Sequence, residues 1–152
     1  MRTLLTQFFA VHDVTKLRRA VTEQAGSCGL SGPRLDDFVL AVHESVVNAV
    51  QHAGGHGHFT LWTVDGVIRS ETSDDGPGIP DRFVDGSRRP PDMSSTGRGI
   101  FLMRRLCDET DFRTGPDGTT VQLTMRLPRN SRQRMRRIRV SADGRPPRRF
   151  TT

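Results

Sequence analysis

The sequence predicts a two-layer α/β sandwich, with a mixed or mostly antiparallel sheet and helices on one face. Strand-like segments occur as hairpin pairs, helical segments separate the pairs, and one long helix has a clear apolar stripe. The chain has 152 residues, 34% of them hydrophobic, a length that fits one domain. No apolar run approaches about 18 residues and no signal-peptide pattern occurs, so we expect a cytoplasmic protein without a membrane segment.

The first elements follow from local patterns. Residues 3–11 have the apolar composition of a strand. Asp13 has a suitable side chain to cap a helix that runs to about residue 25. A second helix is expected over residues 33–53, because its apolar side chains fall within an arc of roughly 120°. The pair Gly54–Gly55 ends this helix.

Two hairpins are expected after the long helix. Strands over residues 58–64 and 67–73 are separated only by Asp65-Gly66, a strong signal for a two-residue turn. Segments 112–114 and 119–127 form a second hairpin around Gly-Pro-Asp-Gly. Apolar residues alternate along the last strand, which indicates that one of its faces is buried.

Between the hairpins, a glycine-flanked helix is expected to begin near Gly97–Gly99 and to end at about Cys107. Residues 82–96 before it are rich in Pro and Arg and have no regular pattern. They separate the helix from the first hairpin.

Charge is distributed unevenly along the chain. The net charge is +6, yet residues 128–152 hold nine arginines and one acid, so residues 1–127 are mildly acidic. We therefore predict a domain over residues 1–127 and a disordered, Arg-rich tail over residues 128–152. Such a tail can contact nucleic-acid phosphates, but no aromatic side chains are interleaved for base stacking. Nucleic-acid binding is therefore the weaker interpretation.

Glu44 and Asn48 are four residues apart on the long helix, so they share a face, which lies opposite the apolar arc. Taken alone, this pair fits an ordinary solvated helix face. A carboxylate beside a carboxamide is also suited to accepting a proton and to coordinating a hard cation. The pair itself leaves both interpretations open.

Two glycine-containing segments are candidates for ligand binding. In Asp74–Ile79 (DDGPGI), Gly76 and Gly78 permit a tight turn or the close approach of a ligand, and an Asp at a strand end can accept a hydrogen bond from an exocyclic amine. In Thr96–Ile100 (TGRGI), helix N–H groups favour a phosphate. Either segment alone is also compatible with a plain turn or helix start. Neither is a P-loop or a dinucleotide fingerprint.

The order of these segments resembles the GHKL, or Bergerat, ATP-binding fold. Within that fold, the chain is most similar to the stand-alone anti-sigma factor serine/threonine kinases of bacteria. The resemblance covers residues 3–127 and rests on four segments: ESVVNAVQHA (Glu44–Ala53), SDDGPGI (Ser73–Ile79), STGRGIFLMRRLCD (Ser95–Asp108) and GTTVQL (Gly118–Leu123).

The resemblance implies ATP and Mg²⁺ as cofactors and gives roles to individual residues. Asn48 would bind Mg²⁺, and Glu44 would be the general base. Asp74 would bind the adenine amino group, with Thr119 assisting through a water, and residues 80–95 would form a lid over ATP. The other implied nucleotide contacts are His52, Gly76, Gly78, Ile79, Thr96, Gly97, Arg98, Gly99 and Ile100.

The activity implied by the resemblance is phosphorylation of a small anti-sigma factor antagonist protein, together with sequestration of a sigma factor. Because family members often dimerise, a homodimer is a further expectation. A nucleotide-gated binding protein without kinase activity is the alternative. Glu44 favours the kinase, since a pure binder has no need of a general base.

Overall fold

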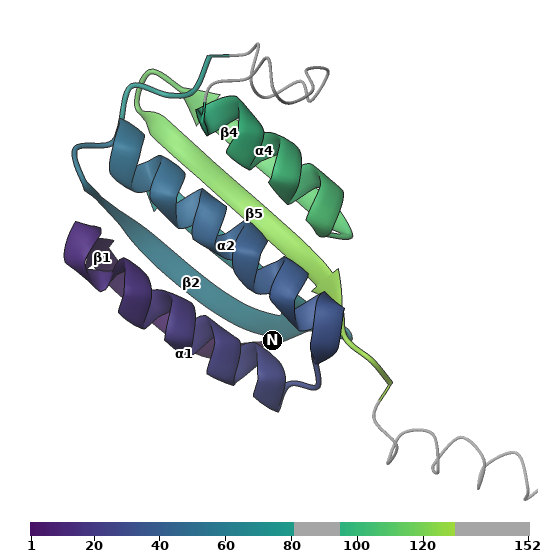
Figure 1. Ribbon diagram of the computed structural model, residues 1–152. Helices are drawn as coiled ribbons and strands as arrows, with labels where there is room; N and C mark the ends of the chain where they lie inside the picture. Colours follow the sequence, from purple (N-terminus) through teal and green to yellow (C-terminus); the bar gives the residue numbers. More distant parts are fainter. Residues whose placement is uncertain (81–94, 130–152) are drawn as a thin grey trace, which may run out of the picture.

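The computed structural model describes residues 1–80 and 95–129. In this part of the chain, a five-stranded sheet forms one layer and three α-helices cover one of its faces (Figure 1). The predicted two-layer α/β sandwich is therefore confirmed, and every strand pairing is antiparallel rather than mixed. Most of the predicted lid (residues 81–94) and most of the predicted tail (residues 130–152) lie outside the described residues.

All the expected elements are present in the described residues. The elements are β1 (Arg2–Ala10), the 3₁₀ turn η1 (Val11–Asp13), α1 (Val14–Ser27), α2 (Gly32–His52), β2 (His56–Val64), β3 (Val67–Asp74), α4 (Ser95–Leu106), β4 (Glu109–Gly115) and β5 (Gly118–Arg126). None of the helices in these ranges has both the length and the apolar character needed to cross a bilayer.

Three local expectations need correction. β4 begins at Glu109 instead of Phe112, because backbone pairing with β5 extends through polar residues that give no strand pattern. α4 begins at Ser95, so Gly97 and Gly99 lie inside the helix. Asp13 occupies the N-cap position of α1, but its Oδ2 accepts from the N–H of Ala10 at 3.0 Å rather than from a helix N–H.

The strand order is β1-β2-β3-β5-β4. Asp65 and Gly66 both have positive φ angles (48° and 79°), as the expected two-residue turn between β2 and β3 requires. The register places Asp74 opposite Thr119, and Thr119 opposite Thr114. These three residues therefore lie side by side at one end of the sheet.

Helix α2 lies between α1 and α4 on the covered face of the sheet (Figure 1). The apolar stripe predicted for α2 is buried and packs against apolar side chains of the sheet. Each Val or Phe of this stripe contributes about 1.5–3 kcal/mol when it is fully buried. The opposite side of α2 is not solvated as its sequence suggests, because α4 packs there and Asn48 is only 4% exposed.

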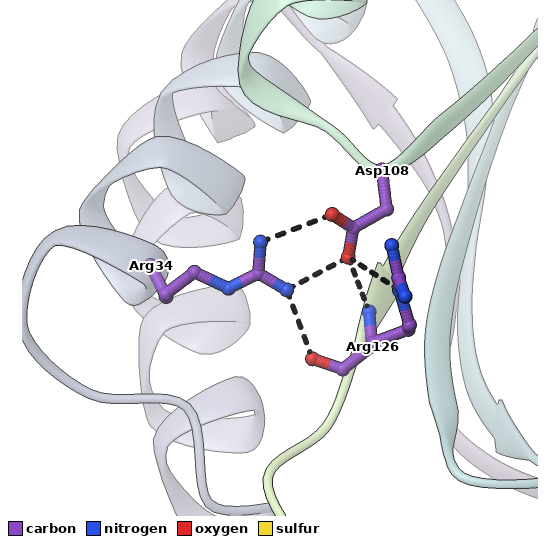
Figure 2. A network of polar contacts seen from close by, with 3 residues as sticks. All are labelled: Arg34, Asp108 and Arg126. Atoms are coloured by element: carbon purple, nitrogen blue, oxygen red, sulfur yellow. Dashed lines mark hydrogen bonds and ion pairs between the residues drawn. The ribbon is translucent and has the colours of Figure 1, made fainter.

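At the other end of the sheet, a polar network joins α2, the connection between α4 and β4, and β5 (Figure 2). The Arg34 guanidinium donates to both carboxylate oxygens of Asp108, at 3.1 and 2.7 Å, and to the carbonyl of Arg126 at 3.1 Å. The Arg126 N–H donates to Asp108 Oδ2 at 2.7 Å. The hydrogen bond from Arg34 is the main cause that lowers the pKa of Asp108 to about 2. The network ties the first turn of α2 to the end of β5.

We expect Arg34→Gln to lower the free energy of unfolding by about 1 kcal/mol at pH 7, because Arg34 is 46% exposed and water screens the pair. The pKa of Asp108 is lower in the folded state, so the contribution is complete above about pH 4 and is lost as the pH falls through about 2. Urea unfolding of both proteins across this range measures the difference.

Arg113→Gln is the matched control, because its pair with Asp111 is more exposed on both sides. It should leave stability nearly unchanged. A difference between wild type and Arg34→Gln that persists undiminished below pH 2 would show that the Asp108 carboxylate is not its source.

Candidate nucleotide site

Three polar side chains form a row across neighbouring strands. Asp74 ends β3, Thr119 lies near the start of β5, and Thr114 lies near the end of β4. The Thr119 N–H donates to Asp74 Oδ1 at 3.2 Å, and the hydroxyls of Thr119 and Thr114 are 2.9 Å apart. Hydrogen bonds therefore connect the Asp74 carboxylate to Thr119, and the Thr119 hydroxyl to the Thr114 hydroxyl.

The loop of residues 75–79, which follows β3, is hydrogen-bonded to the first and the last side chain of this row. The Gly76 N–H donates to Asp74 Oδ1 at 3.0 Å, and the Ile79 N–H donates to Thr114 Oγ1 at 2.7 Å. Ile79 is 7% exposed and belongs to the core. The loop therefore crosses from β3 to β4 and is held there by the Thr114 side chain.

Both glycines of this loop are in close contact with neighbouring backbone. A Cβ at Gly76 would lie 2.5 Å from the carbonyl oxygen of His52, the last residue of α2. Gly78 has a φ of +91°, and a Cβ there would lie 2.5 Å from the carbonyl oxygen of Gly115. The loop is therefore packed between the end of α2 and the end of β4, which explains why glycine occupies both positions.

A second group of candidate residues meets where α2 packs against α4. Glu44 is half-buried and Asn48 is buried on α2. A Cβ at Gly99 of α4 would lie 2.9 Å from Glu44 Oε2 and 3.5 Å from Asn48 Oδ1. The missing side chain of Gly99 thus lets the two helices approach at the Glu44 carboxylate.

Asn48 has the donor chemistry of a cation ligand. Its Nδ2 is buried and has no hydrogen-bond partner among the described residues. Rotating the amide by 180° preserves its shape and places Oδ1 at the unpartnered position. Mg²⁺ binds hard oxygen donors such as amide and carboxylate oxygens. Asn48, with the Glu44 carboxylate near it, therefore fits the ion that the resemblance implies.

The start of α4 supplies the remaining candidates. Thr96 and Gly97 lie in its first turn, at the end of the helix where the helix dipole favours an anion. Arg98 is exposed, and Ile100 is fully buried in the core. Gly97 and Arg98 are thus near the helix end that can receive an anion, while Gly99 contacts α2.

The structure therefore brings the predicted residues into two groups, one at Asp74 and Thr119 and one at Glu44 and Asn48. Helix α2 joins them, because its last residue, His52, contacts the Gly76 loop. Thr114 is absent from the sequence-based candidates. The strand pairing of the second hairpin could have identified it. If the turn is centred on Pro116-Asp117, the register places Thr114 opposite Thr119.

Two hollows open beside the row. One has a volume of about 360 Å³ and is lined by Asp74 and residues 113–120. The other has a volume of about 250 Å³ and is lined by residues 77–80 with Thr114 and Gly115. Thr114 lines both, and neither hollow is lined by Glu44 or Asn48.

Comparisons with solved structures agree with this architecture. The structure of the RsbU and RsbW domains of Rv1364c from Mycobacterium tuberculosis has a TM-score of 0.59 and 21% identity; the match covers 83% of this chain and 33% of that one. The mycobacterial sensor histidine kinase MprB has a TM-score of 0.51 and 16% identity; the match covers 82% of this chain and 100% of that one. At these identities the likeness concerns the fold alone.

Sequence comparisons give the family. An anti-sigma F factor of Geobacillus stearothermophilus is 30% identical in an alignment of length 100 that covers 59% of this chain and 67% of the relative. The family model of the histidine kinase-like ATPase domain matches residues 9–125, which include both groups of candidate residues. The chain belongs to the histidine kinase-like ATPase domain family, within the GHKL fold that its motifs indicate.

Proposed function

We propose that this protein is an ATP- and Mg²⁺-dependent serine/threonine kinase that acts as an anti-sigma factor. The observation that carries the proposal is the placement of Glu44 near the buried amide of Asn48, whose Nδ2 has no hydrogen-bond partner among the described residues, with Gly99 of α4 against both side chains. A binding protein without catalysis does not require a carboxylate at that place. The similarity to an anti-sigma F factor supports the same function.

Asp74 is the proposed receptor for the adenine amino group. Its Oδ1 accepts from the N–H groups of Gly76 and Thr119, which fixes the direction of the carboxylate. No described residue donates a hydrogen bond to Oδ2, so this oxygen is free to accept from an amine. Thr119 is 4% exposed and lies beside Asp74, where its hydroxyl is available to assist through a water.

The proposed reaction transfers the γ-phosphoryl group of ATP to a protein hydroxyl. A bond forms between the hydroxyl oxygen and the γ-phosphorus, the bond from that phosphorus to the bridging oxygen breaks, and ADP leaves. Glu44 accepts the hydroxyl proton. Asn48 would hold Mg²⁺, which would supply positive charge to the phosphate oxygens. The first turn of α4, with Gly97 and Arg98, would hold phosphate oxygens.

The proposed partners are a small antagonist protein, which supplies the phosphorylated Ser or Thr, and a sigma factor, which the protein binds when the antagonist is phosphorylated. Nucleotide state and partner choice are then linked equilibria, so each partner changes the affinity for nucleotide. We propose the cytoplasm as the place of action and a homodimer as the assembly.

The test has two steps. Calorimetric titration with ATP and Mg²⁺ is expected to show saturable binding. Proteins captured from the native cell with and without ATP are then incubated with radiolabelled ATP, and one small captured protein is expected to acquire label on Ser or Thr. Folded protein that binds no ATP contradicts the whole proposal. ATP binding without transfer to any captured protein favours the nucleotide-gated binder.

A further inference from the structure

We propose that Thr114 is a positioning residue for base recognition, which makes the proposed ATP site selective for adenine over guanine. The inference rests on the proposed function, since it concerns the same nucleotide. Thr114 lies on β4, outside the four segments that carry the family resemblance. Its hydroxyl contacts two residues of the base pocket that are 40 positions apart in the sequence, Ile79 and Thr119.

The Thr114 hydroxyl occupies a junction between the loop and the sheet. One of its lone pairs accepts from the Ile79 N–H at 2.7 Å, and it shares a hydrogen bond with Thr119 Oγ1 at 2.9 Å. A hydroxyl has one proton and two lone pairs, so it can make both contacts at once. No other described hydrogen bond attaches the Ile79 N–H to the sheet. Removing the hydroxyl leaves a buried N–H unpaired.

The same junction fixes the group that reads the base. Thr119 holds Asp74 Oδ1 through its N–H, and the Gly76 N–H binds the same oxygen. Adenine presents an amino donor where guanine presents a carbonyl acceptor. A carboxylate held in one direction accepts from the amino group and repels the carbonyl oxygen. If the loop is released from β4, the Gly76 N–H no longer holds Asp74 Oδ1 in place, so the carboxylate loses part of its fixed direction and discrimination falls.

The loop packs closely against the Thr114 hydroxyl. A Cβ at Gly78 would lie 3.0 Å from Thr114 Oγ1. Thr114 lines the hollow beside Asp74 and the hollow beside residues 77–80. It therefore lies between Thr119, the neighbour of Asp74, and the loop of residues 75–79.

The experiment compares ATP and GTP affinities of the full chain by calorimetry with Mg²⁺. Thr114→Val removes the hydroxyl at constant volume, and we expect the ratio of ATP to GTP affinity to fall about tenfold, as for a buried polar group left unpaired. Thr114→Ser restores the hydroxyl and should restore the ratio. Thr110→Val is the matched control, because Thr110 lies on the same face of β4 and should keep the wild-type ratio.

An unchanged ratio in Thr114→Val, or a failure of Thr114→Ser to restore it, would overturn the inference while leaving the proposed function intact. Absence of ATP binding by the wild type would instead remove the proposed function. If Thr114→Val does not fold, Thr114→Ser and Thr114→Ala are compared in the same way. Hydrogen exchange at the Ile79 amide is a second measurement: it should be faster in the variants without the hydroxyl, and equal exchange would contradict the junction.

Discussion

Glu44→Gln is expected to slow phosphoryl transfer by about 10²–10⁴-fold and to change ATP affinity only slightly. Glutamine has nearly the shape of glutamate, so it fits beneath Gly99 as the carboxylate does. It cannot take the proton of the attacking hydroxyl, because its oxygen is a much weaker base. Transfer of radiolabel to the antagonist protein, measured beside calorimetric ATP affinity, separates the two effects.

Asp37→Asn is the matched control for Glu44→Gln. Asp37 lies on α2 two turns before Glu44, on the same side of the helix. The Asp37→Asn substitution therefore removes the same charge from that side. It should keep wild-type transfer. Equal labelling by wild type and Glu44→Gln would exclude Glu44 as the base, and loss of labelling in both variants would attribute the effect to the charge of the helix face.

Asp74→Asn is expected to lower ATP affinity by about a hundredfold or more, as is typical when a site's hydrogen-bond polarity opposes its ligand. The amide oxygen can still accept from Gly76 and Thr119, so the loop should keep its structure. The amide NH₂ group then faces the adenine amino group, and two donors oppose each other. ATP titration of the folded variant measures the loss.

Asp75→Asn serves as its control, because Asp75 is the exposed neighbour in the same loop. It should bind ATP as the wild type does. Undiminished affinity in Asp74→Asn would place the adenine elsewhere. A matching loss in Asp75→Asn would indicate a general charge effect instead of a specific hydrogen bond.

The parts of the fold that the sequence predicts are those specified by short-range patterns. The apolar stripe of α2 is a periodic feature of one segment, and it is buried as expected. The Asp65-Gly66 turn requires two positive φ angles, and these residues adopt them more readily than most. Four motifs in a fixed order then indicate the family before any contact between them is known.

The remaining features depend on contacts between distant segments. The helical arc assigns Asn48 to the solvated side of α2, and only the packing of α4, about 50 residues later, buries it. The first residues of β4 are polar, and only the register with β5 makes them a strand. Thr114 has no motif around it. Its importance follows from a loop, Gly76–Ile79, that crosses to an edge strand.

β5 is the last strand of the described chain, and the polypeptide leaves the sheet at its end, at Arg126. Thr119 lies at the end with Asp74, and Arg126 lies at the opposite end, seven residues and about 24 Å away. The Arg126 peptide is bonded on both sides, through its N–H to Asp108 and through its carbonyl to Arg34. A fluorophore, an affinity tag or a surface tether attached beyond this point would follow a backbone that is hydrogen-bonded on both sides, at the end of the sheet opposite the proposed adenine site.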